Sequence, residues 1–239
     1  MSTLAERDDS AFERVVASVR DHTHALLGLT IGYTDEEWAA ASRLPGWTRS
    51  HVAAHLVGGA RGMARVCQGL QDDRDVLLYS SDQQKANDIE KGSLASGVEL
   101  QVGLDESAGE LDETWLCLQG EDRQVSLRRG YRIQAQDLPL ARLYELVIHT
   151  FDMRTDSDHL GVSGNDAVLL LEFLARQVGN RPDLPAVRVV SDEGFEAVLG
   201  APGEPAPVEG SAADLVMWLA RGVVTPGLRG HPPTIGTMI

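Results

Sequence analysis

The sequence contains little of what several classes of protein require. Its 21 lysines and arginines are outnumbered by 36 aspartates and glutamates, which gives a net charge of −15 at pH 7. Acidic surfaces repel phosphate, and no basic stripe occurs, so nucleic acids and anionic membrane surfaces are not expected partners. No apolar run approaches the roughly 20 residues that a membrane-spanning helix needs. The composition therefore favours small molecules as ligands.

Cysteine and aromatic residues are also scarce. The 2 cysteines, Cys67 and Cys117, form no CxxC pair, so the sequence predicts neither a thiolate metal site nor a redox motif. Their apolar neighbours favour the interpretation that both are small buried hydrophobic residues. The opening segment MSTLAERDDS lacks the pattern of a signal peptide, so we expect a cytoplasmic protein. The acidic surface and an aromatic content of 5% favour a monomer.

The apolar residues that are present predict helices in the first two thirds of the chain. They make up 43% of the 239 residues and are spread along its length, which excludes bulk disorder. Helical spacing predicts four long helices near residues 8–30, 48–70, 94–118 and 138–154. Thr48 or Ser50 is the expected start of the second helix. Residues 71–91 are polar and predict a long loop with one helical piece.

A hairpin and a smaller second domain complete the predicted organisation. Apolar residues alternate over 120–136, around Arg128, Arg129 and Gly130, which predicts the hairpin. Gly, Ser and Asp cluster at 156–165, which indicates a domain boundary. Beyond it we predict further elements: a helix over 167–178, strands over 186–190 and 195–199, a loop over 200–207, a helix over 211–221 and an irregular tail. The predicted fold is an all-α bundle of four long helices over residues 1–157 and a small α+β domain over 158–239.

Two histidine-containing pairs carry the candidate chemistry. His51 and His55 lie four residues apart in the second helix, as do Glu145 and His149 in the fourth, so each pair shares one helix face. His55 shares an apolar stripe with its neighbours, whereas His51 lies towards a more polar side. We therefore expect His55 to point inward. One such pair is most often an ordinary surface feature, but two pairs on separate apolar helices are harder to explain in that way.

The fourth helix adds a third polar side chain to the same face. Glu145, His149 and Asp152 recur at helical spacing on a helix otherwise made largely of apolar residues. Burying such groups costs several kcal/mol unless a metal or a partner compensates. Two imidazole nitrogens and one carboxylate suit zinc with an open position, and they also suit non-haem iron(II). Asp152 would then either hydrogen-bond to a metal ligand and orient it or contact the substrate.

The two motifs resemble those of a known family. The segment GWTRSHVAAH at 46–55, followed by ELVIHTFD at 145–152, is similar to the mycothiol-dependent maleylpyruvate isomerase family, which belongs to the DinB-like metalloenzymes. The resemblance spans nearly the whole chain. It implies a DinB-like four-helix bundle and a sterol-carrier-like C-terminal α/β domain. It also implies that the metal is zinc, although another divalent metal is possible.

The resemblance further implies roles for individual residues. The metal ligands would be His55, Glu145 and His149, the set that the helix faces also select. His51 would shape the pocket as a neighbour, and we expect it and Trp47 to contact the bound thiol. The last helix would place Arg221 over the active site as a catalytic residue, and Asp152 is the second catalytic candidate.

Three functional hypotheses follow. In the first, zinc lowers the pKa of mycothiol, the thiolate attacks an electrophilic carbon, and Arg221 holds a substrate carboxylate or the developing enolate. An isomerase of maleylpyruvate-like substrates would then expel the thiol after bond rotation, whereas an S-transferase would keep the adduct. The second hypothesis is a thiol-independent, metal-dependent hydrolase that activates water. The third is a non-catalytic small-molecule binding or stress-response module.

Overall fold

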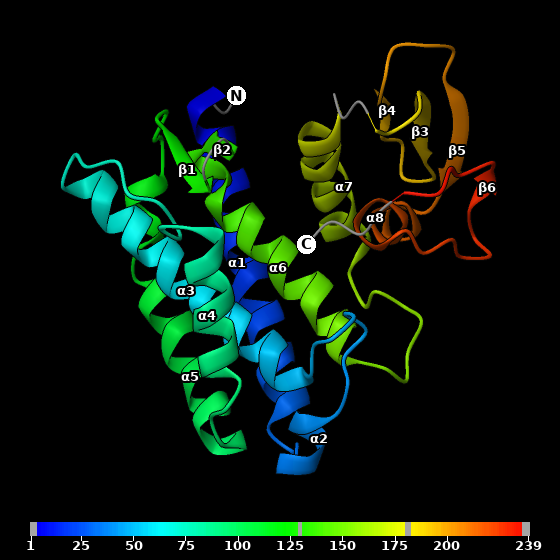
Figure 1. Cartoon of the computed structure of the whole chain (residues 1–239). Coiled ribbons are helices and arrows are strands. Elements are labelled where there is room, and N and C mark those ends of the chain that lie inside the picture. The colour runs from blue at the N-terminus through cyan, green and yellow to red at the C-terminus, as the bar shows by residue number, and fades with distance from the viewer. Residues whose placement is uncertain (1–3, 129–130, 180–182, 236–239) are drawn as a thin grey trace. The chain divides into compact units, whose positions relative to one another are not determined.

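The chain folds into two compact units. The structure is a computed structural model and describes residues 4–128, 131–179 and 183–235. The first unit is Met1–Ser157 and the second is Asp158–Ile239. Figure 1 labels the elements of both.

The first unit consists mainly of helices. Its long helices are α1 (Leu4–Thr30), α3 (Arg49–Gln71), α5 (Gly97–Asp112) and α6 (Leu138–Met153). Helix α1 packs against α5 and α6, and α3 packs against the same two helices (Figure 1). Two short helices, α2 (Asp35–Ala39) and α4 (Asp82–Gly92), complete the set. Helix α4 is the helical piece that was expected within the loop after α3, and it packs against α3.

Side-chain caps set where the helices of the first unit begin. The Thr48 hydroxyl accepts a hydrogen bond from the backbone N–H of His51, so α3 starts at the predicted threonine. Ser96 caps α5 in the same way and forms a capping box with Glu99. Each cap satisfies N–H groups that the first helical turn leaves without backbone partners.

The helix predicted over 94–118 is shorter than expected. Helix α5 ends at Asp112, and a separate 3₁₀-helix, η1 (Trp115–Leu118), follows it. The Thr114 hydroxyl donates to the carbonyl oxygen of Leu111 at 2.7 Å, and this local bond competes with a continued α-helix. Trp115 and Leu118 are only 2% and 0% exposed. The apolar spacing in the sequence continues past the end of α5 because the 3₁₀ turn that follows is also buried. The spacing alone therefore did not mark where the α-helix ends.

The hairpin is confirmed. Strand β1 (Gln124–Arg128) pairs antiparallel with β2 (Tyr131–Gln134), with Val125 opposite Ile133. Arg129 and Gly130, which were expected at its tip, lie outside the described residues. Val125 and Ile133 are 3% and 4% exposed, so the hairpin buries one face against the unit.

The second unit combines two helices with a four-stranded sheet. Its helices are α7 (Gly164–Val178) and α8 (Ala212–Arg221), and both were predicted. The sheet has the order β4-β3-β5-β6, in which β3 and β5 are parallel and the other neighbours are antiparallel. Its strands are β3 (Val187–Ser191), β4 (Glu196–Leu199), β5 (Ala206–Gly210) and β6 (Arg229–Gly230).

Two of these strands correct the sequence prediction. The structure places β5 partly in the predicted loop over 200–207 and β6 in the tail that was expected to be irregular. Pro205 and Pro207 disfavour a strand locally because proline has no N–H to donate. Pairing with β3 nevertheless holds β5 in the sheet, and Val208 is fully buried there. The resemblances of the first unit to a DinB-like bundle and of the second to a sterol-carrier domain stay predictions.

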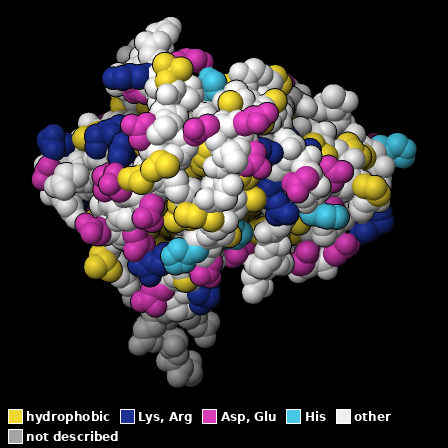
Figure 2. Space-filling view, turned by 90° about the horizontal axis from the view of Figure 1, so that it is seen from below, with side chains coloured by type: hydrophobic (Ala, Val, Ile, Leu, Met, Phe, Trp, Pro, Cys, Tyr) yellow, Lys and Arg dark blue, Asp and Glu magenta, His cyan; other side chains and the backbone are white. Residues whose placement is uncertain are grey.

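The surface and core agree with an ordinary globular fold. On the face that Figure 2 shows, acidic side chains are interspersed with arginine and lysine. Within the described ranges, no helix has both the length and the apolar character needed to cross a membrane. Apolar side chains of α3 and α6 form much of the first core, and those at 0% exposure include Val52, Leu56, Leu138, Leu143, Leu146 and Ile148.

We expect Leu146→Ala to lower the free energy of unfolding by about 2–5 kcal/mol, because it leaves a cavity in this core. Leu116 is 81% exposed, so Leu116→Ala should change stability by no more than about 0.5 kcal/mol. Urea unfolding followed by circular dichroism measures both. Equal effects of the two substitutions would contradict the packing described for α6.

Candidate functional site

The packing of α3 against α6 brings two buried histidines together. His55 on α3 and His149 on α6 are each 6% exposed. Their ring centroids are 4.7 Å apart, and the rings meet edge to face at 89°. Two imidazoles from separate helices are thus in contact inside the first unit. Ligand and metal sites in helix bundles are built in this way, from inward side chains on facing helices.

A buried carboxylate orients one of these imidazoles. The Nδ1 of His149 lies 2.8 Å from Oδ2 of Asp152, whose side chain is 0% exposed. An ionised carboxylate only accepts hydrogen bonds, so Nδ1–H is the donor and Nε2 keeps its lone pair. This carboxylate–histidine arrangement is typical of metal ligands, because it fixes both the tautomer and the ring. Asp152 therefore acts on His149 and is placed to orient it.

The third predicted ligand, Glu145, lies beside a buried arginine. Its side chain is 16% exposed, and Oε2 accepts a hydrogen bond from Nη1 of Arg142 at 3.1 Å. The same Nη1 donates to the carbonyl oxygen of Leu56 at 2.9 Å. Leu56 directly follows His55 on α3. Arg142 thus connects the carboxylate of α6 with the backbone of α3 next to His55.

Arg142 is an unusual residue for the inside of a helix pair. It is only 2% exposed. Burial lowers the pKa of its guanidinium, and the charge and hydrogen bond of Glu145 oppose that shift. A buried cation without partners would cost several kcal/mol. The hydrogen bonds that Glu145 and the Leu56 carbonyl accept from Arg142 offset this cost.

A glycine on α3 makes room for the Glu145 carboxylate. A Cβ atom at Gly59 would lie 2.9 Å from Oε2 of Glu145. Real Cβ atoms do not approach oxygen so closely, so any larger residue would displace the carboxylate. Gly59 lies one helical turn after His55, on the same face. The carboxylate therefore rests against the histidine-bearing face of α3.

Trp47 and His51 lie next to the buried histidine pair. The ring centroid of Trp47 is 5.8 Å from that of His55 and 6.3 Å from that of His51. The Nδ1 of His51 accepts a hydrogen bond from the backbone N–H of Thr48 at 3.2 Å, so His51 belongs to the cap of α3. Its Nε2 is 3.5 Å from Oε2 of Glu90. The expected contact of Trp47 and His51 with a thiol stays a prediction.

Arg221 belongs to the second unit. It is the last residue of α8, and Nη1 donates to the carbonyl oxygen of Ala220 at 3.0 Å. Gly222 follows in the left-handed conformation, with φ of 68°, and ends the helix. The predicted catalytic role of Arg221 stays a prediction.

The imidazole and carboxylate groups of the three predicted ligands suit a metal, although the three side chains do not converge on one point. Within the part of the chain that the structure describes, no three His, Cys, Asp or Glu side chains form a group that would hold a metal ion. The carboxylate of Glu145 is turned to Arg142 instead. Two imidazoles, one of them backed by a carboxylate, and a nearby glutamate nevertheless match the chemistry of zinc ligands. The ligand set stays a prediction.

Sequence reasoning missed two residues around Glu145. Arg142 had a detectable signal, because it is a lone arginine three residues before Glu145 in an apolar helix. The other is Tyr79, whose buried hydroxyl has no hydrogen-bond partner among the described residues. Burial raises the pKa of Tyr79, and the charge of Glu145 raises it further. No periodic pattern in the loop before α4 pointed to this tyrosine.

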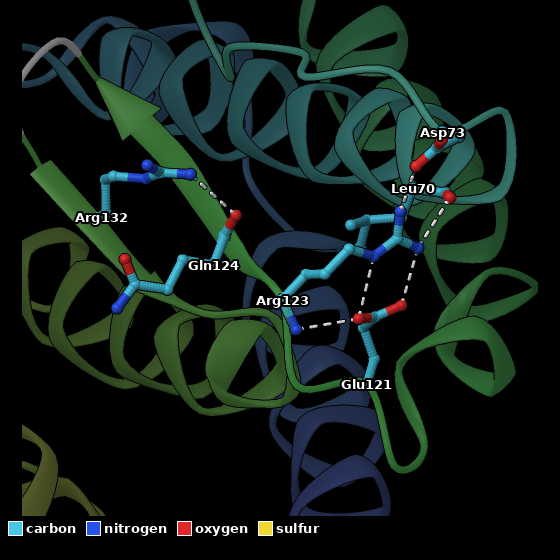
Figure 3. A network of polar contacts seen from close by, with 6 residues as sticks. All are labelled: Leu70, Asp73, Glu121, Arg123, Gln124 and Arg132. Atoms are coloured by element: carbon cyan, nitrogen blue, oxygen red, sulfur yellow. Dashed lines mark hydrogen bonds and ion pairs between the residues drawn. The ribbon is translucent and has the colours of Figure 1, made fainter.

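A surface pocket of about 330 Å³ lies near the other end of α3. None of the predicted site residues lines it. Its polar lining includes Arg123, Gln124 and Arg132, which Figure 3 shows in a network with Leu70, Asp73 and Glu121. Arg123 is paired there with Asp73 and Glu121, and Arg132 donates to the backbone carbonyl of Gln124.

Comparison with known proteins establishes the family. Residues 19–154 match the family model of the mycothiol maleylpyruvate isomerase N-terminal domain, and this match covers more than half of the chain. The chain therefore belongs to that family.

Two solved structures have a similar fold: the mycothiol-dependent maleylpyruvate isomerase and a single-site mutant of it. Each is 19% identical to this chain, with a TM-score of 0.79, over 95% of this chain and 97% of the other. A search of curated proteins found no match.

We expect Arg142→Met to lower the free energy of unfolding by about 3–5 kcal/mol, because it leaves Glu145 and the Leu56 carbonyl without their buried partner. Arg61 is a matched control, since its pair with Glu110 is 3.5 Å long and both side chains are about half exposed. Arg61→Met should cost no more than about 1 kcal/mol. Chemical denaturation of both variants tests this, and a mild effect at Arg142 would contradict the buried bridge.

Proposed function

We propose that this protein is a zinc-dependent isomerase that uses mycothiol as its cosubstrate, with Met1–Ser157 as the metal-binding domain. The observation that carries the proposal is the buried contact between His55 and His149, with Asp152 bonded to Nδ1 of His149. Membership of the family supports it, as does the fold shared with the solved isomerase. His55, Glu145 and His149 would hold the zinc. When bound, zinc supplies a lowered thiol pKa, so that a thiolate is available near neutral pH.

The residues around the ligands have distinct tasks in this proposal. Asp152 holds the proton on Nδ1 of His149 and so presents the Nε2 lone pair. Arg142 hydrogen-bonds to Glu145 and to the Leu56 carbonyl and so fixes the position of the Glu145 carboxylate along α3. Trp47 forms an aromatic wall beside His55, and that wall excludes water from the bound thiol.

Arg221 is the residue that we propose for the substrate. A guanidinium binds a carboxylate through two parallel hydrogen bonds, which orients an acidic substrate such as maleylpyruvate. The same residues would serve an S-transferase, which differs in keeping the bond between thiol and substrate. The isomerase is favoured because it is the activity named for the solved structure of the same fold.

The first experiment is a calorimetric titration of mycothiol into the zinc-loaded protein, in two buffers of different ionisation enthalpy. Binding with proton release is expected, because the bound thiol loses its proton, and metal-stripped protein should not bind. Turnover of a maleylpyruvate-like substrate then separates isomerase from S-transferase by the product. Turnover without any thiol would favour the hydrolase and contradict the proposal.

The ligand assignment is tested with His149→Ala. We expect loss of zinc binding at one ion per chain and loss of thiol-dependent turnover, because one of three ligands is removed. His24 is an exposed histidine of α1, and His24→Ala is the matched control that should keep both. Full zinc content and activity in His149→Ala would exclude the proposed ligand set.

Asp152→Asn should weaken zinc binding about 10–100-fold, because the amide no longer fixes the Nδ1–H tautomer of His149. Competition with a chromophoric chelator measures the affinity. Asp156 is exposed on the loop that follows α6, so Asp156→Asn should leave the affinity unchanged. An unaltered affinity in Asp152→Asn would show that Asp152 does not support a metal ligand.

A further inference from the structure

The fold brings the two cysteines of the chain together. Cys67 lies on α3 and is 0% exposed, whereas Cys117 lies on η1 and is partly exposed. The Cys117 thiol donates a hydrogen bond to the backbone carbonyl of Cys67, with Sγ and oxygen 3.8 Å apart. The two thiols also act on each other, since each shifts the pKa of the other. The sequence prediction of two unrelated buried cysteines is therefore incomplete, because they form a contact pair.

Contacts other than those of the thiols hold this pair together. Helix α3 packs directly against η1. Shortly after η1, Arg123 donates from Nη2 to the carbonyl oxygen of Leu70 at 2.9 Å and pairs with Asp73 at 3.0 Å (Figure 3). Both partners lie at the C-terminal end of α3. Arg123 thus fastens the segment that carries Cys117 to the same half of α3 that carries Cys67.

The two thiols are chemically unequal. The neighbouring Cys67 side chain lowers the pKa of the Cys117 thiol, and the charge of Arg123 lowers it further, while burial and Glu121 oppose the shift. The neighbouring Cys117 side chain raises the pKa of Cys67, and burial adds to that rise. Cys117 is thus the thiol that is both reachable and more readily ionised. Cys67 lies next to Cys117 and is shielded from solvent.

We propose that Cys117 and Cys67 form a thiol–disulfide exchange site whose substrates are small-molecule disulfides. Cys117 is the attacking thiol and Cys67 the resolving thiol. The pair is separate from the histidine site, since Cys67 follows His55 on α3 by three helical turns, about 18 Å at about 1.5 Å per residue. The proposal does not depend on zinc or on the proposed isomerase activity.

The exchange balances in two steps. The Cys117 thiolate attacks one sulfur of the small disulfide, a Cys117–sulfur bond forms, and the other half leaves as a thiolate. The Cys67 sulfur then attacks Cys117, gives its proton to the departing small thiolate, and the Cys67–Cys117 disulfide forms. The two cysteines lose two electrons in total, and the small disulfide is reduced to two thiols.

The test uses the native full-length protein and hydroxyethyl disulfide, with acid quenching, alkylation, trypsin digestion and mass spectrometry. Trypsin releases Cys67 in peptide 66–74 and Cys117 in peptide 92–123. We expect the wild-type protein to lose both free thiols and to yield these peptides as one cross-linked species that a reductant separates. With no other cysteine in the chain, no other internal disulfide can form.

Two variants separate the roles of the thiols. Cys67→Ala should stop at a stable mixed disulfide on Cys117, because the resolving thiol is gone. Cys117→Ala should stay unreacted while folded and react at Cys67 only after unfolding in urea, because the native fold buries that sulfur. Circular dichroism of each variant checks that it is folded.

Three results would overturn the proposal. They are a wild-type protein that keeps both thiols free, one that stops at a mixed disulfide on Cys117, and one that forms only disulfide-linked dimers. Each would show that the two sulfurs do not exchange with each other. Zinc content and isomerase turnover are measured separately, so a failure here leaves the proposed function untouched, and the reverse also holds.

Discussion

Arg142 carries a buried charge on an apolar helix. The packing of α6 against α3, the two histidine-bearing helices, depends on the hydrogen bonds that this charge makes. Its guanidinium bonds to Glu145 on its own helix and to the Leu56 carbonyl of α3. Because a buried cation without partners is costly, these contacts fix the axial position of α6 against α3. Apolar packing alone is non-directional and would not select that position so sharply.

The polar groups of the candidate site are arranged as two oriented pairs. Asp152 is hydrogen-bonded to Nδ1 of His149, and Arg142 is hydrogen-bonded to Glu145. Each pair gives a carboxylate a hydrogen-bond donor on the same helix. The ring that Asp152 orients meets the ring of His55 edge to face, with the two centroids 4.7 Å apart.

Helix α3 is used twice. Near its N-terminus, the cap formed by Thr48 and His51 presents His55 next to Trp47. Near its C-terminus, the Arg123 network presents Cys67 to Cys117. These ends are far enough apart that chemistry at one need not disturb the other. A rigid helix that is buried along most of its length is well suited to hold both sets of side chains in place.

The sequence by itself determined most of the helices and the face that carries each candidate ligand. Apolar spacing and the capping residue Thr48 are local signals, so α3, α6 and α8 were predictable, as was the inward side of His55, whereas the helix predicted over 94–118 was too long. Only the tertiary structure decided which strands pair and which side chains contact each other across the chain. Strand β5 exists because β3 pairs with it, Arg142 is satisfied by a backbone carbonyl from another helix, and Cys67 meets a cysteine on η1. Such contacts join residues far apart in the chain, and no local spacing records which surfaces will pack together.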